Sequence, residues 1–171
     1  MTFLPLFTNV IIKMKSNQRD YLKYWKVIRT YYKVKHNLTQ ADIDMLLFLY
    51  SERYFNFTTF KEYEKLFTWD IERFEKLKRL GWIELFSTKQ PGRPAMRSRA
   101  LYSLSYKAKR MVNSMYKKIE GEEIPETLCN NPLFKKNVKP SEKPYKDMIK
   151  MMNKEIRENR ATGQELRHVP E

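Results

Sequence analysis

The feature that most constrains the fold is a change in the spacing of apolar residues at Gly81. Residues 69–80 place apolar side chains at every third position from Ile71 to Leu80, as one face of a helix does. Residues 82–86 and 101–105 are instead short runs rich in aromatic and aliphatic side chains, which is typical of strands. Residues 87–100 contain two prolines and a glycine and do not form one continuous element. The pattern predicts a helix that stops at a left-handed glycine and is followed by a β-hairpin with a long loop.

Threonine residues predict where the helices before this hairpin begin. Thr39 and Thr59 are each followed three residues later by an acid, which is the spacing of a capping box. Thr68 offers a further N-cap, for the helix over residues 69–80. Two short helices with almost no linker between them, the second stopped by Gly81, indicate a helix-turn-helix.

Amphipathic helices are expected on both sides of this unit. An aromatic face runs from Tyr21 to Tyr32, within a helix predicted over residues 19–35. Methionine-rich faces follow in helices that begin near Ser105 and Lys143. The fold class is therefore mainly α with a small β-hairpin, an α+β arrangement of a winged helix-turn-helix with extra flanking helices. The predicted parts are an N-terminal arm (1–18), a winged helix-turn-helix domain (19–121), a polar linker (122–140), a C-terminal amphipathic helix (141–158) and a tail expected to be disordered (159–171).

The charge balance of the chain favours a polyanionic partner. Its 34 lysines and arginines exceed its 20 aspartates and glutamates, which gives a formal net charge of +14. A net charge of this size raises the local concentration of phosphates and speeds their encounter with the protein. The alternative is a positive charge that is spread over the whole surface and serves only solubility.

The sequence lacks the motifs of enzymes and of metal sites. Its single cysteine, Cys129, excludes an intramolecular disulfide framework and a thiolate-rich zinc site. His36 and His168 have no metal-ligand spacing and are expected to be plain surface residues. The four glycines are not clustered into a phosphate-binding loop, and no nucleophile elbow occurs. We therefore expect a protein that is not an enzyme and that needs no cofactor or metal.

The first residues are apolar but do not predict a membrane segment. Residues 3–12 contain Pro5, lack a basic lead-in and a small-residue cleavage site, and are too short to span a bilayer. They are expected to form an arm that packs on the domain or on a second subunit. The chain is expected to be cytoplasmic.

The loop of the predicted hairpin is the main argument for DNA as the partner. Residues 87–100 contain four cations and no acid, and a loop of this length in a hairpin is usually kept for a function. The cations are Lys89, Arg93, Arg97 and Arg99. Arginine suits a narrow groove because its flat, weakly hydrated guanidinium is attracted by the negative potential there. The Pro-Gly-Arg-Pro run at residues 91–94 also resembles the core of minor-groove AT-hook segments. The alternative is a solvated flexible loop.

The helix over residues 69–80 is the candidate recognition helix. With Thr68 as its N-cap, Trp69 and Arg73 are expected near the groove floor and Lys76 nearer the phosphates. Three acids share this helix, so only its N-terminus, where backbone N–H groups attract phosphate, is expected to enter the groove. The alternative is an ordinary helix whose acids and cations pair at i,i+4 spacing, such as Glu72 with Lys76.

Four stretches carry a resemblance to a known family. Residues 38–47 are similar to the helix before the helix-turn-helix of the multiple-antibiotic-resistance regulator (MarR) type of winged helix. Residues 73–83 resemble the end of its recognition helix, and residues 92–93 and 101–108 resemble its wing-tip arginine, second wing strand and following helix. The resemblance covers about residues 21–121. It implies a homodimer held together by the first helix and the C-terminal helices, with no ligand-pocket residue that can be carried over.

Two hypotheses of function follow. The first is a transcriptional regulator that binds double-stranded DNA through a winged helix-turn-helix, as a homodimer. The alternative is a non-enzymatic structural or protein-interaction module of winged-helix fold with nonspecific nucleic-acid affinity. The operator, the direction of regulation and any small-molecule effector stay open.

Overall fold

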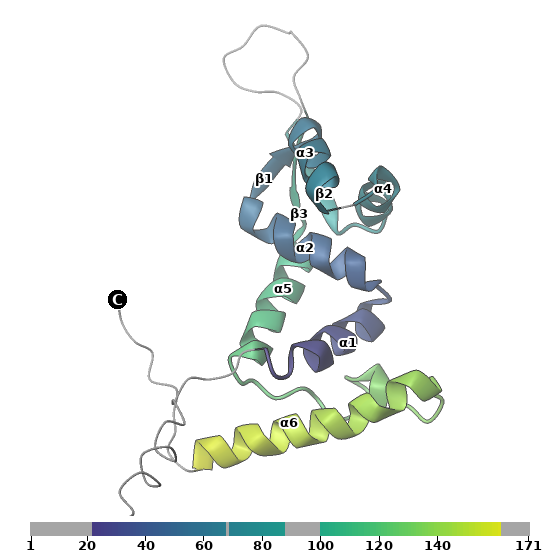
Figure 1. Ribbon diagram of the computed structural model, residues 1–171, viewed down its shortest axis with the longest axis vertical. Coiled ribbons are helices and arrows are strands. Elements are labelled where there is room, and N and C mark those ends of the chain that lie inside the picture. The colour runs from purple at the N-terminus through teal and green to yellow at the C-terminus, as the bar shows by residue number, and fades with distance from the viewer. Residues whose placement is uncertain (1–21, 68, 88–99, 162–171) are drawn as a thin grey trace, which may run out of the picture.

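The computed structural model describes residues 22–67, 69–87 and 100–161, and this part of the chain is mainly helical with a small antiparallel sheet (Figure 1). In chain order its elements are α1 (Trp25–His36), α2 (Gln40–Glu52), β1 (Tyr54–Asn56), α3 (Phe57–Phe67), α4 (Ile71–Arg79), β2 (Ile83–Ser87), β3 (Leu101–Leu104), α5 (Tyr106–Ile119), the 3₁₀ turns η2 (Pro132–Phe134) and η3 (Pro140–Glu142), and α6 (Lys143–Ala161). The predicted α+β class is confirmed.

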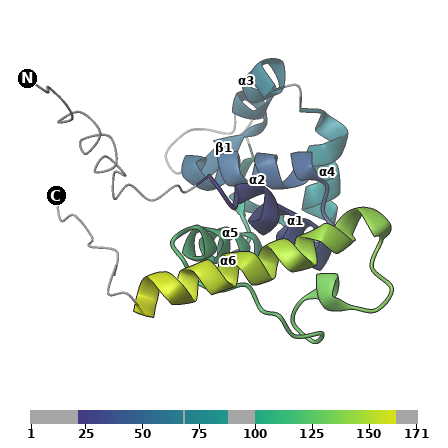
Figure 2. The same ribbon diagram turned by 60° about the horizontal axis from the view of Figure 1, so that its bottom comes forward.

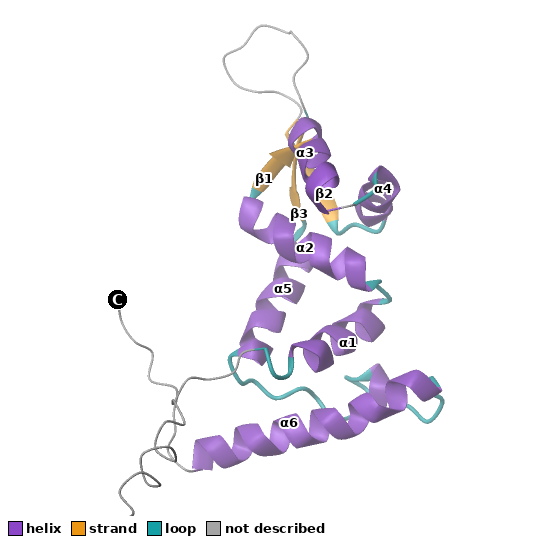
Figure 3. Ribbon diagram, in the orientation of Figure 1, coloured by secondary structure: helices purple, strands orange, loops and turns teal. Residues whose placement is uncertain are grey.

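The sheet has three strands in the order β1-β3-β2, so β3 lies between the other two (Figure 3). The hairpin β2–β3 was predicted, and it pairs Ile83 with Leu104 and carries an irregularity between Leu85 and Ser87. Strand β1 was missed, although Tyr54 pairs with Ser103 across it. Three residues are too few for an alternating pattern to stand out in a sequence.

The caps of α2 and α3 test the two threonine predictions. In α2 the capping box is confirmed, because Thr39 Oγ1 accepts from the N–H of Asp42 and Asp42 Oδ2 accepts from the N–H of Thr39. In α3 the prediction is wrong. The side chain of Asn56 accepts from the N–H of Thr59 at 2.9 Å, so the helix begins at Phe57, upstream of the threonine. Asparagine caps a helix at least as well as threonine.

Helix α4 begins two residues later than predicted. Asp70 is its N-cap, with Oδ1 accepting from the N–H of Arg73 at 2.6 Å. The predicted cap, Thr68, lies outside the described residues. Trp69 therefore precedes the helix instead of opening it, and its side chain is buried in the core.

The end of α4 agrees with the glycine argument. Gly81 has a φ of +71°, in the left-handed region. The N–H of Trp82 donates to Leu77 O at 2.9 Å and the N–H of Gly81 donates to Lys78 O at 3.0 Å, which together form a Schellman motif. This turn leads the chain directly from α4 into β2.

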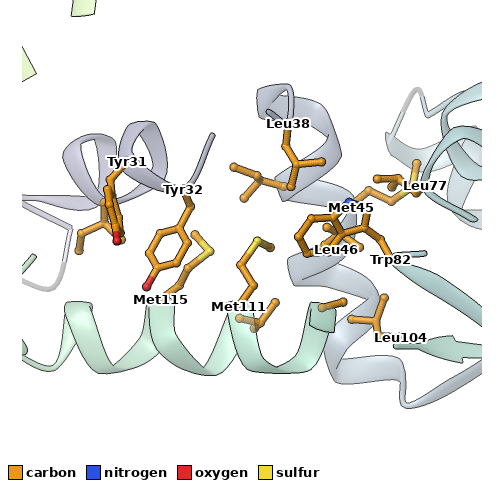
Figure 4. Packing of buried hydrophobic residues seen from close by; sticks show 14 of the residues in the cluster. Tyr31, Tyr32, Leu38, Met45, Leu46, Leu77, Trp82, Leu104, Met111 and Met115 are labelled. Carbon is orange, nitrogen blue, oxygen red and sulfur yellow. The ribbon is translucent and has the colours of Figure 1, made fainter. Parts of the chain in front are cut away.

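Helices α1 and α5 pack against each other through the apolar faces that the sequence assigned to a dimer interface. Met111 and Met115 of α5 point toward Tyr32 of α1 (Figure 4). The hydroxyl of Tyr32 donates to Ser114 Oγ at 2.6 Å, and burial raises the pKa of that phenol. The two faces are thus largely covered within one protomer, because Tyr31, Tyr32, Met111 and Met115 are all buried.

The segment predicted as a polar linker, residues 122–140, packs onto the core instead. Ile124 and Leu133 are buried. The side chain of Asn153 accepts from the N–H of Ile124 at 3.0 Å and donates to its carbonyl at 2.8 Å, so it satisfies the backbone there. The linker was predicted from the prolines and polar residues of the segment, and its isolated apolar residues were not taken into account.

Helix α6 packs against α1 and lies across one end of the molecule, and the sheet lies toward the other end (Figures 1 and 2). Its start matches the prediction, and it runs to Ala161, past the predicted end at residue 158. Glu155 joins it to α1 through hydrogen bonds from Tyr24 and from Lys23 Nζ, the latter at 2.7 Å. None of the helices in the described ranges is both long and apolar enough to cross a membrane.

Candidate nucleic-acid interface

Helix α4 is held on the rest of the domain by one narrow face. Phe74 and Leu77 are fully buried, while Glu72 and Arg79 on the other side are exposed. The helix packs next to β2, into which it leads through the Gly81 turn. The side of α4 that faces away from Phe74 and Leu77 is exposed or half-exposed.

The side chain of Arg73, predicted to reach the groove floor, is bound to α2. Its Nη1 donates to Asp42 Oδ1 at 2.7 Å and to Thr39 Oγ1 at 2.9 Å. Asp70, the N-cap of the same helix, lies 3.9 Å from its other nitrogen. Arg73 is only 24% exposed, so it is committed to contacts inside the protein.

Lys76, predicted to meet phosphates, has the same partner. Its Nζ donates to Asp42 Oδ2 at 2.7 Å. Burial of Asp42 raises the pKa of its carboxyl, but the hydrogen bonds from Lys76, Thr39 and Arg73 outweigh burial and hold the pKa below its usual value. One fully buried carboxylate therefore neutralises part of the charge of two cations of α4.

Asp42 is the residue of this candidate site that the sequence did not indicate. It was identified only as the acid of a capping box, which uses one of its oxygens, while both oxygens also receive a cation from α4. The acids of α4 itself were the suspected partners. In the described part of the chain, the ion pair within α4 besides Arg73–Asp70 is Lys78–Glu75 at 3.4 Å, not the predicted i,i+4 pairs.

Trp69 does not reach outward, contrary to the prediction. Its ring packs edge-to-face against Phe48 of α2, with centroids 5.3 Å apart. An indole in this position fixes the turn that leads into α4. It contributes to the core that supports the helix and not to a surface.

The two strands of the hairpin have their loop-side ends at one end of the sheet. Strand β2 ends at Ser87 and β3 begins near it at Leu101, at the end of the sheet remote from α6 (Figure 1). Lys89, Arg93, Arg97 and Arg99 lie outside the described residues, as Thr68 does. The strands that carry the loop are described, and Tyr54 of β1 meets Phe86 of β2 across β3, with the ring planes tilted by 46° and the centroids 4.4 Å apart.

A junction of aromatic and basic side chains lies where α1, α5 and the start of β2 meet. His36, predicted to be a plain surface residue, is half-buried, stacked on Tyr32 and edge-to-face with Trp82. Lys107 lies over the Trp82 ring at 4.1 Å. Burial, followed by the charges of Lys35 and Lys107, lowers the pKa of His36 to about 4, so its imidazole is neutral at pH 7.

The described residues contain no cluster of histidine, cysteine and acidic side chains that would hold a metal ion. Comparison with family models, with curated proteins and with solved structures gives no match to this chain. Any function is therefore argued from the residues and their geometry.

Proposed function

We propose that this chain is a DNA-binding regulator that contacts duplex DNA through α4 and the β2–β3 hairpin, in the manner of a winged helix. One observation carries the proposal. A helix with one side exposed or half-exposed passes through the Gly81 turn into a hairpin, and the loop of that hairpin contains four cations and no acid. A helix beside a basic hairpin has the dimensions to meet a groove and the phosphates that flank it.

The two parts contribute differently to binding. Asp42 already occupies Arg73 and Lys76, and Asp70 and Glu72 place negative charge at the start of α4. These acids oppose a phosphate at the helix N-terminus, where the sequence had predicted one. Helix α4 therefore orients the protein on the duplex, and the hairpin loop supplies most of the electrostatic attraction.

Homodimer formation remains a prediction with a revised interface. The faces of α1 and α5 that motivated it are largely covered within the protomer, whereas Met148 and Met151 on the outer side of α6 are exposed. A symmetric dimer would bury these methionines. Light scattering at micromolar concentration tests this, and a monomer would remove the dimer from the proposal without affecting the DNA contacts.

The experiment that tests the proposal removes the charge of the loop. Arg93, Arg97 and Arg99 are changed together to Ala, and duplex binding is measured at several salt concentrations. Each lost phosphate contact lowers the log–log salt slope by about 0.9. A control variant removes three exposed or half-exposed lysines from other helices: Lys26, Lys109 and Lys117. An unchanged slope in the loop variant, or an equal change in the control, would refute the role of the hairpin.

A second candidate is the winged-helix module that binds nucleic acid without sequence preference. The neutralised cations of α4 favour it, because Arg73 held by Asp42 is not available for a bidentate contact with guanine. Selection of binding sites from random duplexes separates the two. Enrichment of one sequence supports a regulator. If no sequence is enriched and the protein binds scrambled duplexes with the same affinity, the result supports the module.

A further inference from the structure

We propose that the DNA interface continues beyond α4, over the junction of α1 and α5, and ends on the first half of α6. This inference rests on the proposed function and extends its site. The surface is called the lysine ridge here and consists of Lys35, Lys107, Lys135, Lys136, Lys139, Lys143, Lys146 and Lys150. Its partner is the phosphate backbone of the same duplex.

The two halves of α6 differ in how their cations are paired. In the second half, Lys154, Arg157 and Arg160 each form an ion pair, with oxygens 3.0 to 3.8 Å away. For residues 135–150, no acidic oxygen of the described chain lies within ion-pair distance of any of the six lysines. In the second half, Arg157 and Arg160 thus bind acids of the segment before η2, and Lys154 pairs within the helix, whereas the first half has no such pairs with described residues.

The acids along the same stretch are few. Residues 135–150 hold six lysines against Glu142 and Asp147, a net charge of +4. Five of the six lysines are exposed, and Lys146 is half-buried with its Nζ 5.4 Å from the centre of the Phe134 ring. This concentration of unpaired charge produces a positive potential that attracts a polyanion.

Helical geometry places three of these lysines in one row. Lys143, Lys146 and Lys150 follow i, i+3, i+7 spacing and therefore share a face of α6. At a rise of about 1.5 Å per residue the row is about 10 Å long. Duplex DNA carries one charge per about 1.7 Å of axis, so a row of this length faces several phosphates.

A series of contacts links the end of α4 to the segment that leads into the lysines of residues 135–150. Trp82, which follows the α4 turn, touches His36 of α1 and lies under Lys107 of α5. One turn back on α1, Tyr31 accepts a hydrogen bond from Lys35 and donates one to the carbonyl of Asn130, at 2.9 and 3.3 Å. Asn130 leads into η2, which is followed by the first lysines of the stretch.

The arrangement in space agrees with this path. The C-terminal end of α1 and the first half of α6 lie on the same side of the molecule as α4, and both views show this (Figures 1 and 2). A straight duplex docked on α4 can run along that side. An acidic protein would not need the ridge to be continuous with α4, and for this reason we assign the ridge to DNA.

The test compares duplex lengths. A duplex of about 10 base pairs, one helical turn, is compared with one three times longer, at several salt concentrations. The variant Lys143→Gln, Lys146→Gln, Lys150→Gln should lower the salt slope on the longer duplex by up to about 2.7, for three contacts. It should leave the shorter duplex unaffected. The control is the triple variant Lys26→Gln, Lys109→Gln, Lys117→Gln, which removes the same number of positive charges elsewhere on the surface. The loop variant is measured in parallel.

The outcomes separate the ridge from the proposed function. A slope that falls equally in the control, or equally on both duplexes, overturns the ridge and leaves α4 and the hairpin in place. Loss in the ridge variant with no change in the loop variant supports the ridge and refutes the hairpin contact. A parent protein that binds neither duplex overturns both. Binding of an acidic peptide in place of the duplex also overturns the assignment to DNA.

Discussion

The cations of α4 and those at the start of α6 are of the same chemical type, but the fold treats them differently. Arg73 and Lys76 share the buried carboxylate of Asp42, whereas the lysines of residues 135–150 form no ion pair with described residues. The helix predicted to read DNA thus holds two of its four cations, Arg73 and Lys76, against a buried carboxylate. The difference teaches that charge counted along a sequence does not say which cations are available to a polyanion.

The two arrangements also differ in their consequences for stability. Breaking a buried ion pair strongly destabilises the folded protein, because the desolvation of the charges is no longer compensated. An exposed lysine without a partner is fully hydrated and contributes little to folding. The comparison therefore predicts a large effect on unfolding at Asp42 and almost none at the start of α6.

The largest effect is expected from Asp42→Ala. This change removes the carboxylate that joins α2 to α4 together with half of the α2 capping box. We expect the free energy of unfolding to fall by about 3 kcal/mol, measured by urea denaturation. The matched control is Asp44→Ala on the same helix, where an exposed carboxylate lies 3.8 Å from Arg29 and is expected to contribute less than about 1 kcal/mol. Equal losses at the two positions would refute the special role of Asp42.

The next effect is a pH dependence at His36, which lies between Lys35 and Lys107 on the ridge. Its folded pKa is about 4 against an ordinary value of 6.5, so acid protonates the unfolded chain first. Stability is then lost as the pH falls from 6.5 toward 4, by about 2 kcal/mol between pH 7 and pH 5. The variant His36→Phe keeps a ring against Tyr32 and Trp82 and should lack this loss. If parent and variant lose stability equally over this range, the imidazole does not titrate as proposed.

Much of the fold was accessible to local reasoning, because local rules decide it. The Gly81 turn and the Thr39 cap each depend on residues within a few positions of one another, and the hairpin joins two strands that follow one another in the chain. Thr59 shows how this reasoning fails. The helix begins three residues before the predicted position, because the strand that was missed ends at Asn56 and the side chain of Asn56 caps the helix.

The site was less accessible, because its main contacts join distant parts of the chain. Asp42 and Arg73 are 31 positions apart. The sequence around either residue does not indicate that α4 turns Arg73 and Lys76 toward the N-terminus of α2. His36 was expected at the surface for the same reason, since Trp82 lies 46 positions further on. A single sequence shows which residues carry charge and not which of them meet.

A smaller effect, on binding, is expected from Asp42→Asn. Asparagine keeps an oxygen that can accept from the N–H of Thr39 but removes the negative charge opposite Arg73 and Lys76. The two cations then attract DNA more strongly, and we expect affinity for a duplex to rise about fivefold, or about 1 kcal/mol. Titration at fixed salt measures this, with circular dichroism as the check that the variant is folded. Unchanged or weaker binding by a folded variant would show that the charge of α4 does not face the duplex.

The smallest effect is expected on unfolding when ridge lysines are removed. Lys143 and Lys150 are exposed and form no ion pair with described residues, so replacing both with glutamine removes charge but no ion pair within the described part. The free energy of unfolding should stay within about 0.5 kcal/mol of the parent, by the same urea measurement. The matched control is Lys118→Gln, because Lys118 is buried and donates to Glu122 and to the carbonyl of Glu123, both at 2.6 Å. That variant should lose about 2 kcal/mol, since a buried charged hydrogen bond is removed. A comparable loss in the double variant would mean that the lysines at the start of α6 serve the fold, and the contrast with α4 would fail.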